Sequence, residues 1–421
     1  MTAGNWRKPR SEPRVASCER YLPLTSFKPA CPASDQDPVT TAGRLSRVLY
    51  VIGLNPSLKY GSLEEQIFSL ALAFQKEGGL FIPLFQSPPG PEAHAMYRAA
   101  GLNVEWLNLG AFCFATLWRL MRLIRETRVE LVHWNLYHPV NLYMLSLALL
   151  LPRLRHYLTD HVTRELPIVL PRMGARRAVK GVLLRRYSQI LCVSDFVQRQ
   201  LQAEGVWPNL RTCTHFINTE RFRPDDVGRS DLRKELDVAD RFVVLVVAHL
   251  VQWKGIDVVL RALRRLPVRV VAWILGDGPE ATRLATLCKS LSLVARVRFF
   301  GYQLDVSRYM QAADCLVCPT IWAEAAGLVI LEGLACQLPV IASAVGGIPE
   351  FVEHGRTGFL FPPGDDAQLA ESIGHLERDP QACRRMGSEA RSVMVARFST
   401  KKRLGEYLDL YRVLGRGGHD G

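Results

Sequence analysis

No apolar run in the sequence is long enough to cross a lipid bilayer, and the longest runs, such as residues 143–151, stop well short of that length. The first residues, MTAGNWRKPRSEPR, also lack the apolar segment of a secretory signal peptide. Ten cysteines are present, but they are scattered without the rhythm of a disulfide framework. These features predict a protein with reduced thiols that is located in the cytoplasm or on the inner face of the plasma membrane.

Acidic residues are scarce relative to basic ones, because 40 Asp and Glu stand against 53 Lys and Arg and give a formal net charge of +13. A basic balance favours an anionic partner, meaning nucleic acid, anionic lipid or a phosphorylated substrate. The only Asp-x-Asp pattern, Asp35 and Asp37, lies in a proline-rich stretch and is not expected to bind a metal. Cys315 and Cys318 form a C-x-x-C pair without a second pair or a histidine cluster, so we expect them in the core.

From residue 46 onward, short apolar segments alternate with helical patterns, which is typical of parallel α/β sheets. The strands expected in a first series are residues 46–53, 80–85, 129–134, 155–159 and 189–193. Those of a second series are residues 241–250, 268–276, 297–301, 314–319, 339–343 and 357–361. Ser62 and Glu65 predict a capping box for the first helix, which should run to Glu77.

The segment CPTIWAEAAGLVILEGLACQLPVIAS, residues 318–343, carries two glutamates, Glu324 and Glu332. A strand here runs into a short loop that opens a helix near Gly327, and the N–H groups at a helix start attract phosphate. Glu332 should lie about a turn and a half into this apolar helix, where it can accept two hydrogen bonds from a diol such as ribose. Glu324 can accept from sugar hydroxyls. The segment predicts a nucleotide-sugar pocket, and solvated surface glutamates are the alternative.

This segment resembles the signature of retaining glycosyltransferases of family 4, which have the GT-B fold. Further segments resemble motifs of that family in the expected order, namely VVAHLVQWKGIDVVL (246–260), ILGDGPE (274–280), AVGGIPEFVEHGRTGFLFPPGD (344–365) and the linker HFINTERFRP (215–224). The resemblance covers residue 45 to the C-terminus. It implies an acceptor-side Rossmann-like domain (45–220), a nucleotide-sugar domain (221–398) and a last helix (399–421) that crosses back. Residues 1–44 contain six prolines and no periodic apolar pattern, so we expect a disordered tail there, and a misplaced start of the sequence is the alternative.

The resemblance also implies which residues bind the donor and carry the chemistry. The donor-binding residues would be Gly61, His249, Lys254, Asp277, Gly278, Glu324, Gly327, Leu328 and Glu332, and the catalytic ones His161, Glu324 and Lys254. Lys254 and the start of the helix would hold the diphosphate, so no metal would be required. Glu332 would bind the ribose, Glu324 the sugar, and the turn at Asp277 the region of the base.

Three candidate donor-site residues, His161, Gly61 and His249, can be compared with the pattern of the family. His161 ends a strand at the place where the family commonly has a histidine facing the donor sugar; a satisfied loop histidine is the alternative. Gly61 ends a loop in which the family often has two adjacent glycines, whereas Tyr60 precedes it here. His249 stands where the family usually has arginine, so less charge would reach the diphosphate.

A basic stretch without acidic residues, RMGARRAVKGVLLRR (172–186), predicts an amphipathic helix that could contact anionic lipid headgroups. A solvated helix face is the alternative interpretation. Contact with lipid would suit an acceptor that is carried by a lipid.

We therefore expect a metal-independent, retaining glycosyltransferase that moves a sugar from a UDP- or GDP-linked donor to an acceptor hydroxyl in the synthesis of a cell-surface glycan or glycolipid. Its partners would be the nucleotide sugar, a glycan or lipid-linked acceptor and an anionic membrane surface, without nucleic acid and without a cofactor. A catalytically silent binding protein with the same fold is the alternative, and His249 is its main support.

Overall fold

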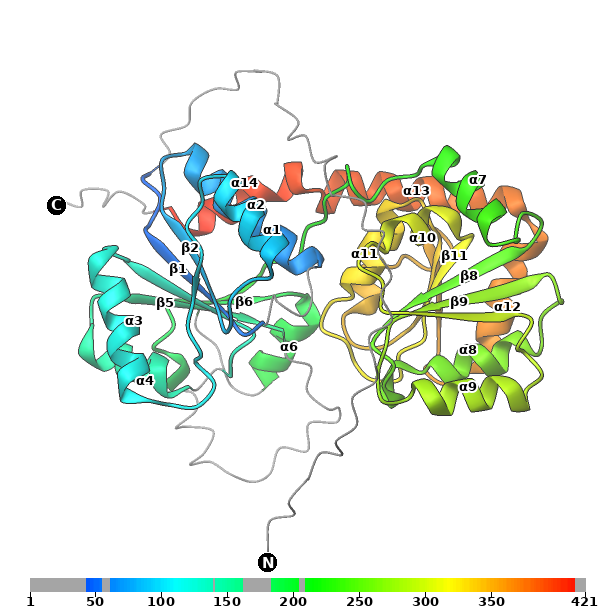
Figure 1. Cartoon of the computed structure of the whole chain (residues 1–421), viewed down its shortest axis with the longest axis horizontal. Coiled ribbons are helices and arrows are strands. Elements are labelled where there is room, and N and C mark those ends of the chain that lie inside the picture. Colours follow the sequence, from blue (N-terminus) through cyan, green and yellow to red (C-terminus); the bar gives the residue numbers. More distant parts are fainter. Residues whose placement is uncertain (1–42, 55–60, 139–140, 162–182, 204–208, 413–421) are drawn as a thin grey trace, which may run out of the picture. The chain divides into compact units, whose positions relative to one another are not determined.

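The computed structural model describes residues 43–54, 61–138, 141–161, 183–203 and 209–412. Residues 1–42 of the expected N-terminal tail, the loop residues 55–60 and residues 172–182 of the basic stretch lie outside this part of the chain. The described residues form two parallel β-sheets with helices on both faces of each (Figure 1). We call residues 43–224, which carry the first sheet, the first half, and residues 225–398 the second half.

The first sheet has the strand order β3-β2-β1-β4-β5-β6-β7, and every pair of neighbours is parallel. Its strands are β1 (Val48–Ile52), β2 (Phe81–Phe85), β3 (Glu105–Trp106), β4 (Leu131–Asn135), β5 (Arg155–Asp160), β6 (Gln189–Cys192) and β7 (Leu210–Thr212). Its helices are α1 (Ser62–Lys76), α2 (Pro91–Ala99), α3 (Phe114–Glu126), α4 (Leu142–Leu150) and α6 (Asp195–Ala203).

Alternate residues of β1 supply the cores on the two faces of the first sheet, as the two-residue period of a strand requires. Leu49 and Val51 pack with α3, α4 and α6, whereas Val48, Tyr50 and Ile52 pack with α1 and α2. All five side chains are at most 4% exposed. Burial on both faces explains why the parallel strands form nearly continuous apolar runs in the sequence.

The second sheet has the order β10-β9-β8-β11-β12-β13 and is also parallel throughout. Its strands are β8 (Phe242–Val247), β9 (Val270–Leu275), β10 (Val297–Gly301), β11 (Cys315–Cys318), β12 (Val340–Ser343) and β13 (Gly358–Phe361). Its helices are α7 (Asp226–Glu235), η1 (Gln252–Lys254), α8 (Ile256–Leu263), α9 (Ala281–Ser290), α10 (Ser307–Ala312), α11 (Leu328–Ala335), η2 (Ile348–Glu350), α12 (Asp366–Arg378) and α13 (Pro380–Phe398). Cys315 and Cys318 are buried thiols on β11, which confirms them as core residues.

The end of the described chain returns to the first half. Helix α14 (Thr400–Leu410) contacts α1, and Tyr407, Leu408 and Leu410 belong to the core beside β1. The Tyr411 hydroxyl lies 2.7 Å from Nδ1 of His133 on β4. The core on one face of the first sheet is therefore completed by residues that follow the whole second sheet in the sequence (Figure 1).

Every strand expected from the sequence is present, with ends shifted by only a few residues, so the two parallel sheets are confirmed. The sequence missed β3 and β7, because both are short edge strands and β3 is exposed. The capping box at Ser62 and Glu65 was wrong. Gly61 is the N-cap of α1 and donates its N–H to Glu64 Oε2 at 2.9 Å, because the side chains of Ser62 and Glu65 have other partners.

Candidate functional site

A cavity of about 660 Å³ lies between side chains of the first and second halves. Its lining residues are Leu63, His161, Val193 and His215 from the first half, and Trp253, Lys254, Trp322, Ala323, Glu324, Ala325, Ala326 and Leu328 from the second. Most of them follow the carboxyl ends of β5, β6, β8 and β11, where ligands of parallel α/β sheets bind.

An ion pair joins the two charged residues of the cavity, because Lys254 Nζ lies 2.6 Å from a carboxylate oxygen of Glu324. Burial lowers the pKa of Lys254, but the charge of Glu324 and its hydrogen bond outweigh this effect, so the pKa is raised and the lysine stays protonated. Gly255 permits this approach: it has φ +64°, and a Cβ there would meet Pro319 O at 2.1 Å.

The start of α11 lies next to this ion pair. Gly327 is the N-cap of the helix and Leu328, its first residue, lines the cavity. The first N–H groups of a helix have no carbonyl partner in the preceding turn, and they carry a partial positive charge. Lys254 supplies a cation and the helix start supplies N–H donors, and both kinds of group suit a phosphate, although Glu324 balances the charge of Lys254.

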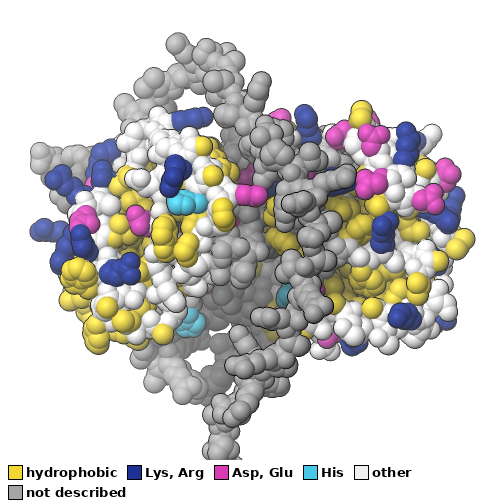
Figure 2. All heavy atoms as spheres, in the orientation of Figure 1, with side chains coloured by type: hydrophobic (Ala, Val, Ile, Leu, Met, Phe, Trp, Pro, Cys, Tyr) yellow, Lys and Arg dark blue, Asp and Glu magenta, His cyan; other side chains and the backbone are white. Residues whose placement is uncertain are grey.

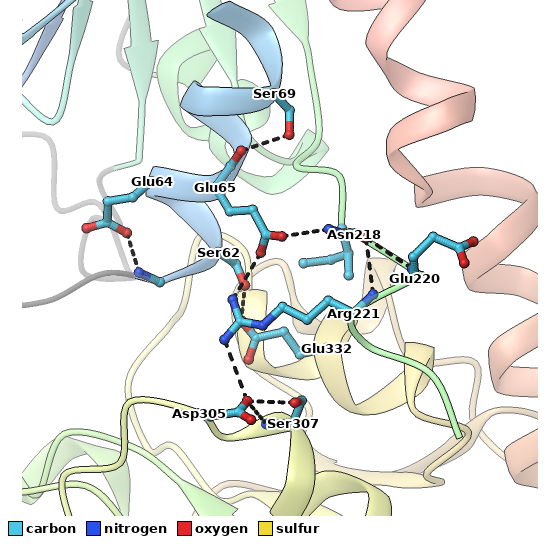
Figure 3. A network of polar contacts seen from close by, with 12 residues as sticks. Ser62, Glu64, Glu65, Ser69, Asn218, Glu220, Arg221, Asp305, Ser307 and Glu332 are labelled. Carbon is cyan, nitrogen blue, oxygen red and sulfur yellow. Dashed lines mark hydrogen bonds and ion pairs between the residues drawn. The ribbon is translucent and has the colours of Figure 1, made fainter. Parts of the chain in front are cut away.

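Glu332 lies five residues after the N-cap Gly327, about a turn and a half into α11 as expected, and it is 8% exposed. Figure 3 shows its carboxylate beside Ser62, the first residue of α1. The Ser62 hydroxyl donates a hydrogen bond to this carboxylate. The apolar surroundings of α11 explain why the carboxylate takes a partner there. Glu332 is not among the residues that line the cavity.

A second polar group in the same region connects the first half to its linker and to the second half (Figure 3). The Asn218 side-chain amide donates to Glu65 at 2.6 Å, and Arg221 pairs with the other Glu65 oxygen at 3.1 Å. Arg221 also lies 3.7 Å from Asp305 of the second half. Sequence reasoning missed this group, because its members are ordinary polar residues far apart in the chain.

Another contact missed by the sequence joins the motif around Glu350 to the first half. The Glu350 carboxylate accepts from the backbone N–H groups of Asp195 at 2.8 Å and Phe196 at 2.6 Å, at the start of α6. A carboxylate is favourable at a helix N-terminus. The GGIPE sequence, which lies between β12 and β13, therefore makes a contact between the halves.

His249 and the turn at Asp277 and Gly278 lie together but outside the cavity lining. His249 Nδ1 is 2.5 Å from the Asp277 backbone oxygen, and the Asp277 carboxylate accepts from Gly278 N at 2.7 Å. His249 is exposed. The Nδ1 atom of its imidazole is therefore bound within the chain, and Nε2 is the nitrogen that could bind a ligand.

His161 lines the cavity directly after β5, and its Nε2 lies 2.7 Å from Asn135 Oδ1. Burial lowers the pKa of His161 to about 4, so the imidazole is neutral at neutral pH. Gly61 is not among the residues that line the cavity, but Leu63, two residues later in α1, is one of them.

Of the residues proposed from the sequence, the cavity brings together His161, Lys254, Glu324 and Leu328. His215 lines the same cavity although it was noted only as the start of the linker. Within the described segments, no group of three or more His, Cys, Asp or Glu side chains is placed to hold a metal. In the same part of the chain, no helix is both long and apolar enough to span a membrane.

Comparison with known proteins places the chain in a family. The family model "Glycosyl transferases group 1" matches residues 229–393, and "Glycosyltransferase Family 4" matches residues 63–221. A GDP-mannose-dependent alpha-(1-6)-phosphatidylinositol monomannoside mannosyltransferase of Mycolicibacterium smegmatis is 30% identical over 65% of this chain and 74% of its own length. The chain belongs to glycosyltransferase family 4 and has the GT-B fold, as its sequence motifs suggested.

Other relatives share shorter stretches. N-acetyl-alpha-D-glucosaminyl L-malate synthase of Bacillus anthracis is 32% identical over 49% of this chain and 55% of its own length, so the chain spans only about half of that protein. Among solved structures, Anabaena Alr3699/HepE in complex with UDP-glucose has a TM-score of 0.71 at 23% identity and covers 87% of this chain and 100% of its own. At this identity, the likeness shows the fold alone.

Proposed function

We propose that this protein transfers a sugar from a nucleotide-diphosphate donor, such as a UDP- or GDP-sugar, to an acceptor hydroxyl with retention of the anomeric configuration. The observation that carries the proposal is the half-buried Lys254–Glu324 pair beside the start of α11. A family member that acts with GDP-mannose supports a nucleotide-sugar donor, as does the HepE fold with UDP-glucose bound. Relatives with roles in lipopolysaccharide core synthesis support a cell-surface glycan or glycolipid as the product.

In this proposal, the second half stabilises the leaving diphosphate. Negative charge grows on the diphosphate as the bond to the sugar breaks, and a fixed cation with helix N–H groups stabilises that charge. Lys254 and the backbone at Gly327 and Leu328 provide these groups, which is why we propose catalysis without a metal. Glu324 has two oxygens, so one can hold Lys254 while the other accepts from a sugar hydroxyl.

Glu332 and the turn at Asp277 are assigned to the nucleoside. A ribose diol would replace Ser62 as the donor to the Glu332 carboxylate. The Asp277 and Gly278 turn, with His249 bound to it, would lie near the base and the diphosphate. His161 would contact the transferred sugar from the first half.

The direct test is transfer by the purified full chain. We expect release of UDP or GDP from one nucleotide sugar of a hexose panel in the presence of glycan or lipid acceptors, and an α- or β-linkage in the product that matches the donor. Tight nucleotide-sugar binding with no transfer or hydrolysis would instead favour the catalytically silent alternative.

We also propose that the first half docks on an anionic membrane, where a lipid-linked acceptor would be met. Hydrophobic side chains are exposed along α3 and α4, including Phe114 at 79%, Trp118 at 61% and Leu149 at 74%. In Figure 2 hydrophobic side chains gather beside Lys and Arg side chains at the lower left, where Figure 1 shows α3 and α4.

The chemistry of this α3–α4 surface suits a lipid interface. Arg119, Arg122 and Arg125 of α3 are exposed, and the Arg122 guanidinium lies 5.7 Å from the Trp118 ring centre. Tryptophan and arginine beside exposed leucines are typical of helices that lie in the headgroup region. The surface is independent of the basic stretch 172–186, of which the structure describes only residues 183–186.

A further inference from the structure

Two histidines of the first half face each other in the wall of the cavity. The ring centres of His161 and His215 are 5.2 Å apart, with an angle of 30° between the ring planes. Both rings line the cavity, and His215 is 4% exposed. They come from different elements, since His161 follows β5 and His215 follows β7.

The tautomer of His161 is fixed by its neighbours. The Asn135 amide nitrogen donates to the Tyr50 hydroxyl, so the Asn135 oxygen must be the atom that faces His161. An amide oxygen only accepts, and therefore Nε2 of His161 carries the hydrogen. Nδ1 of His161 is left with a lone pair.

His215 also contacts an amide, that of Gln66, whose nitrogen is buried and has no partner among the described residues. Its Nδ1 lies 3.0 Å from Gln66 Oε1 of α1, and donation to this oxygen leaves a lone pair on Nε2. Burial and the neighbouring His161 lower the pKa of His215 to about 3, so the ring is neutral at neutral pH. The cavity wall of the first half thus presents two uncharged imidazoles, each held through one nitrogen.

The second nitrogen of each ring remains available to a ligand. Neither has a hydrogen-bond partner in the described part of the chain, and neither is among the atoms that are both buried and unpartnered. His156 of β5 differs in this respect, because its Nε2 is buried and has no partner among the described residues. The available nitrogens of His161 and His215 are therefore reached from the cavity.

Lone pairs of neutral imidazoles do not suit phosphate, which needs donors or cations, but they suit hydroxyl groups. The cation of Lys254 and the start of α11 line the same cavity from the second half. A ligand with its diphosphate at these groups would place its next group, the sugar, toward the histidines.

We propose that His215, positioned by Gln66, is a second sugar-binding residue whose Nε2 accepts a hydrogen bond from a hydroxyl of the donor sugar. The inference rests on the proposed nucleotide-sugar donor and adds a specificity determinant to it. In this proposal, His161 and His215 of the first half accept hydrogen bonds from neighbouring hydroxyls on one edge of the sugar.

The test compares binding of free nucleotides and nucleotide sugars by calorimetry, using the full chain with UDP, GDP and a panel of UDP- and GDP-hexoses. We expect His215→Ala to lower the affinity for the preferred nucleotide sugar about 3- to 10-fold, which is the range for one neutral hydrogen bond. The affinity for free UDP or GDP should not change. His215→Gln places an amide oxygen at a similar reach and should recover most of the affinity. His156→Ala, which removes a buried histidine outside the cavity, is the matched control and should lower stability only.

Donor analogues that lack one hydroxyl at a time locate the contact. The analogue without the hydroxyl bound by His215 should bind wild type and His215→Ala equally, while the other analogues keep the difference. Gln66→Leu removes the hydrogen-bond partner of the His215 ring and should also lower the affinity for the nucleotide sugar.

Each remaining outcome overturns the inference. Equal nucleotide-sugar affinity of wild type and His215→Ala would disprove it and leave the proposed function standing. Equal weakening of free nucleotide and nucleotide sugar would show a role in the fold or the nucleotide site, and a loss seen only in the KM of the acceptor would assign His215 to the acceptor. Absence of any nucleotide binding by wild type would remove the proposed function together with this inference.

Discussion

The two halves of the protein contribute opposite kinds of chemistry to the same cavity. The second half supplies charge, through Lys254, Glu324 and the start of α11, on short elements that follow β8 and β11. The first half supplies neutral groups, because burial keeps the pKa values of His161 and His215 at about 4 and about 3. The halves share an α/β architecture, so the difference lies in the few side chains after the strand ends.

This difference suggests a division of work. A fixed charge is suited to holding the diphosphate, which is common to all nucleotide sugars, whereas neutral acceptors can distinguish hydroxyl patterns. The predictions below test this division, beginning with the largest expected effect.

Acid should destabilise the first half before the second. Burial lowers the pKa of His133 and His215 to about 3 and of His156 and His161 to about 4, all in the first half. The unfolded chain takes up these protons near pH 6.5 and the folded chain does not, so the free energy of unfolding falls as the pH drops from about 6.5 toward 4. The loss is up to about 1.4 kcal/mol per pH unit for each histidine.

Hydrogen exchange followed by mass spectrometry at pH 7 and pH 5 measures this effect. Peptides that contain β1, β4 and β5 should lose protection at pH 5 before those that contain β8 and β9. Equal loss in both sheets would contradict the assignment of acid sensitivity to the first half.

Lys254→Ala should lower kcat about 10²- to 10³-fold, the usual cost of removing one group that stabilises developing negative charge. Steady-state kinetics with the preferred donor measures it, and Lys289→Ala, an exposed lysine on α9, is the control. A loss of less than about threefold would mean that the second half does not provide the essential charge.

Glu332→Ala should weaken free UDP or GDP by roughly 1.5–3 kcal/mol, because the ribose loses a charged acceptor. Ser62→Ala removes the other partner of the same contact and should leave nucleotide affinity equal or slightly higher. If both substitutions lower the affinity for the nucleotide equally, the Ser62–Glu332 contact, rather than a contact of Glu332 with ribose, supports the site.

The α3–α4 surface should bind anionic vesicles more strongly than neutral ones at low salt. Each basic residue at such a surface contributes about 1 kcal/mol, so Arg119→Gln with Arg122→Gln and Trp118→Ser should release the protein without changing donor affinity. Co-sedimentation measures this, and Arg185→Gln with Arg186→Gln tests the alternative surface. Equal pelleting with neutral vesicles would exclude an anionic docking surface.

Chelation should have the smallest effect. Enzyme treated with EDTA is expected to keep most of its transfer activity, because Lys254 and the helix start carry the charge that a divalent ion would otherwise supply. Complete loss that Mn²⁺ or Mg²⁺ restores would contradict this part of the proposal.

The sequence predicted the sheets well, because buried parallel strands such as 242–247 and 270–275 are apolar throughout and leave little ambiguity. Lys254 and Glu324 were proposed from motifs, and the structure brings them into contact. The motifs show which residue types are present, but their roles toward a donor stay predictions.

Other features could not be predicted from the sequence, since they depend on contacts between distant segments. Glu332 meets Ser62, His215 meets Gln66, and Arg221 meets Glu65, each across more than a hundred residues. No local pattern marks such pairs. His215 in particular gave no signal, because a single histidine in a linker is unremarkable until its neighbours are known.

The return of α14 to the first sheet has a consequence for biosynthesis. Tyr407, Leu408, Leu410 and Tyr411 fill the core beside β1, yet a ribosome makes them only after the entire second half. A nascent chain can therefore fold its second sheet while one face of the first is still open. A premature stop just before residue 400 would leave the second sheet intact and expose the apolar face of the first, so such truncated chains should be selective targets for chaperones and proteases.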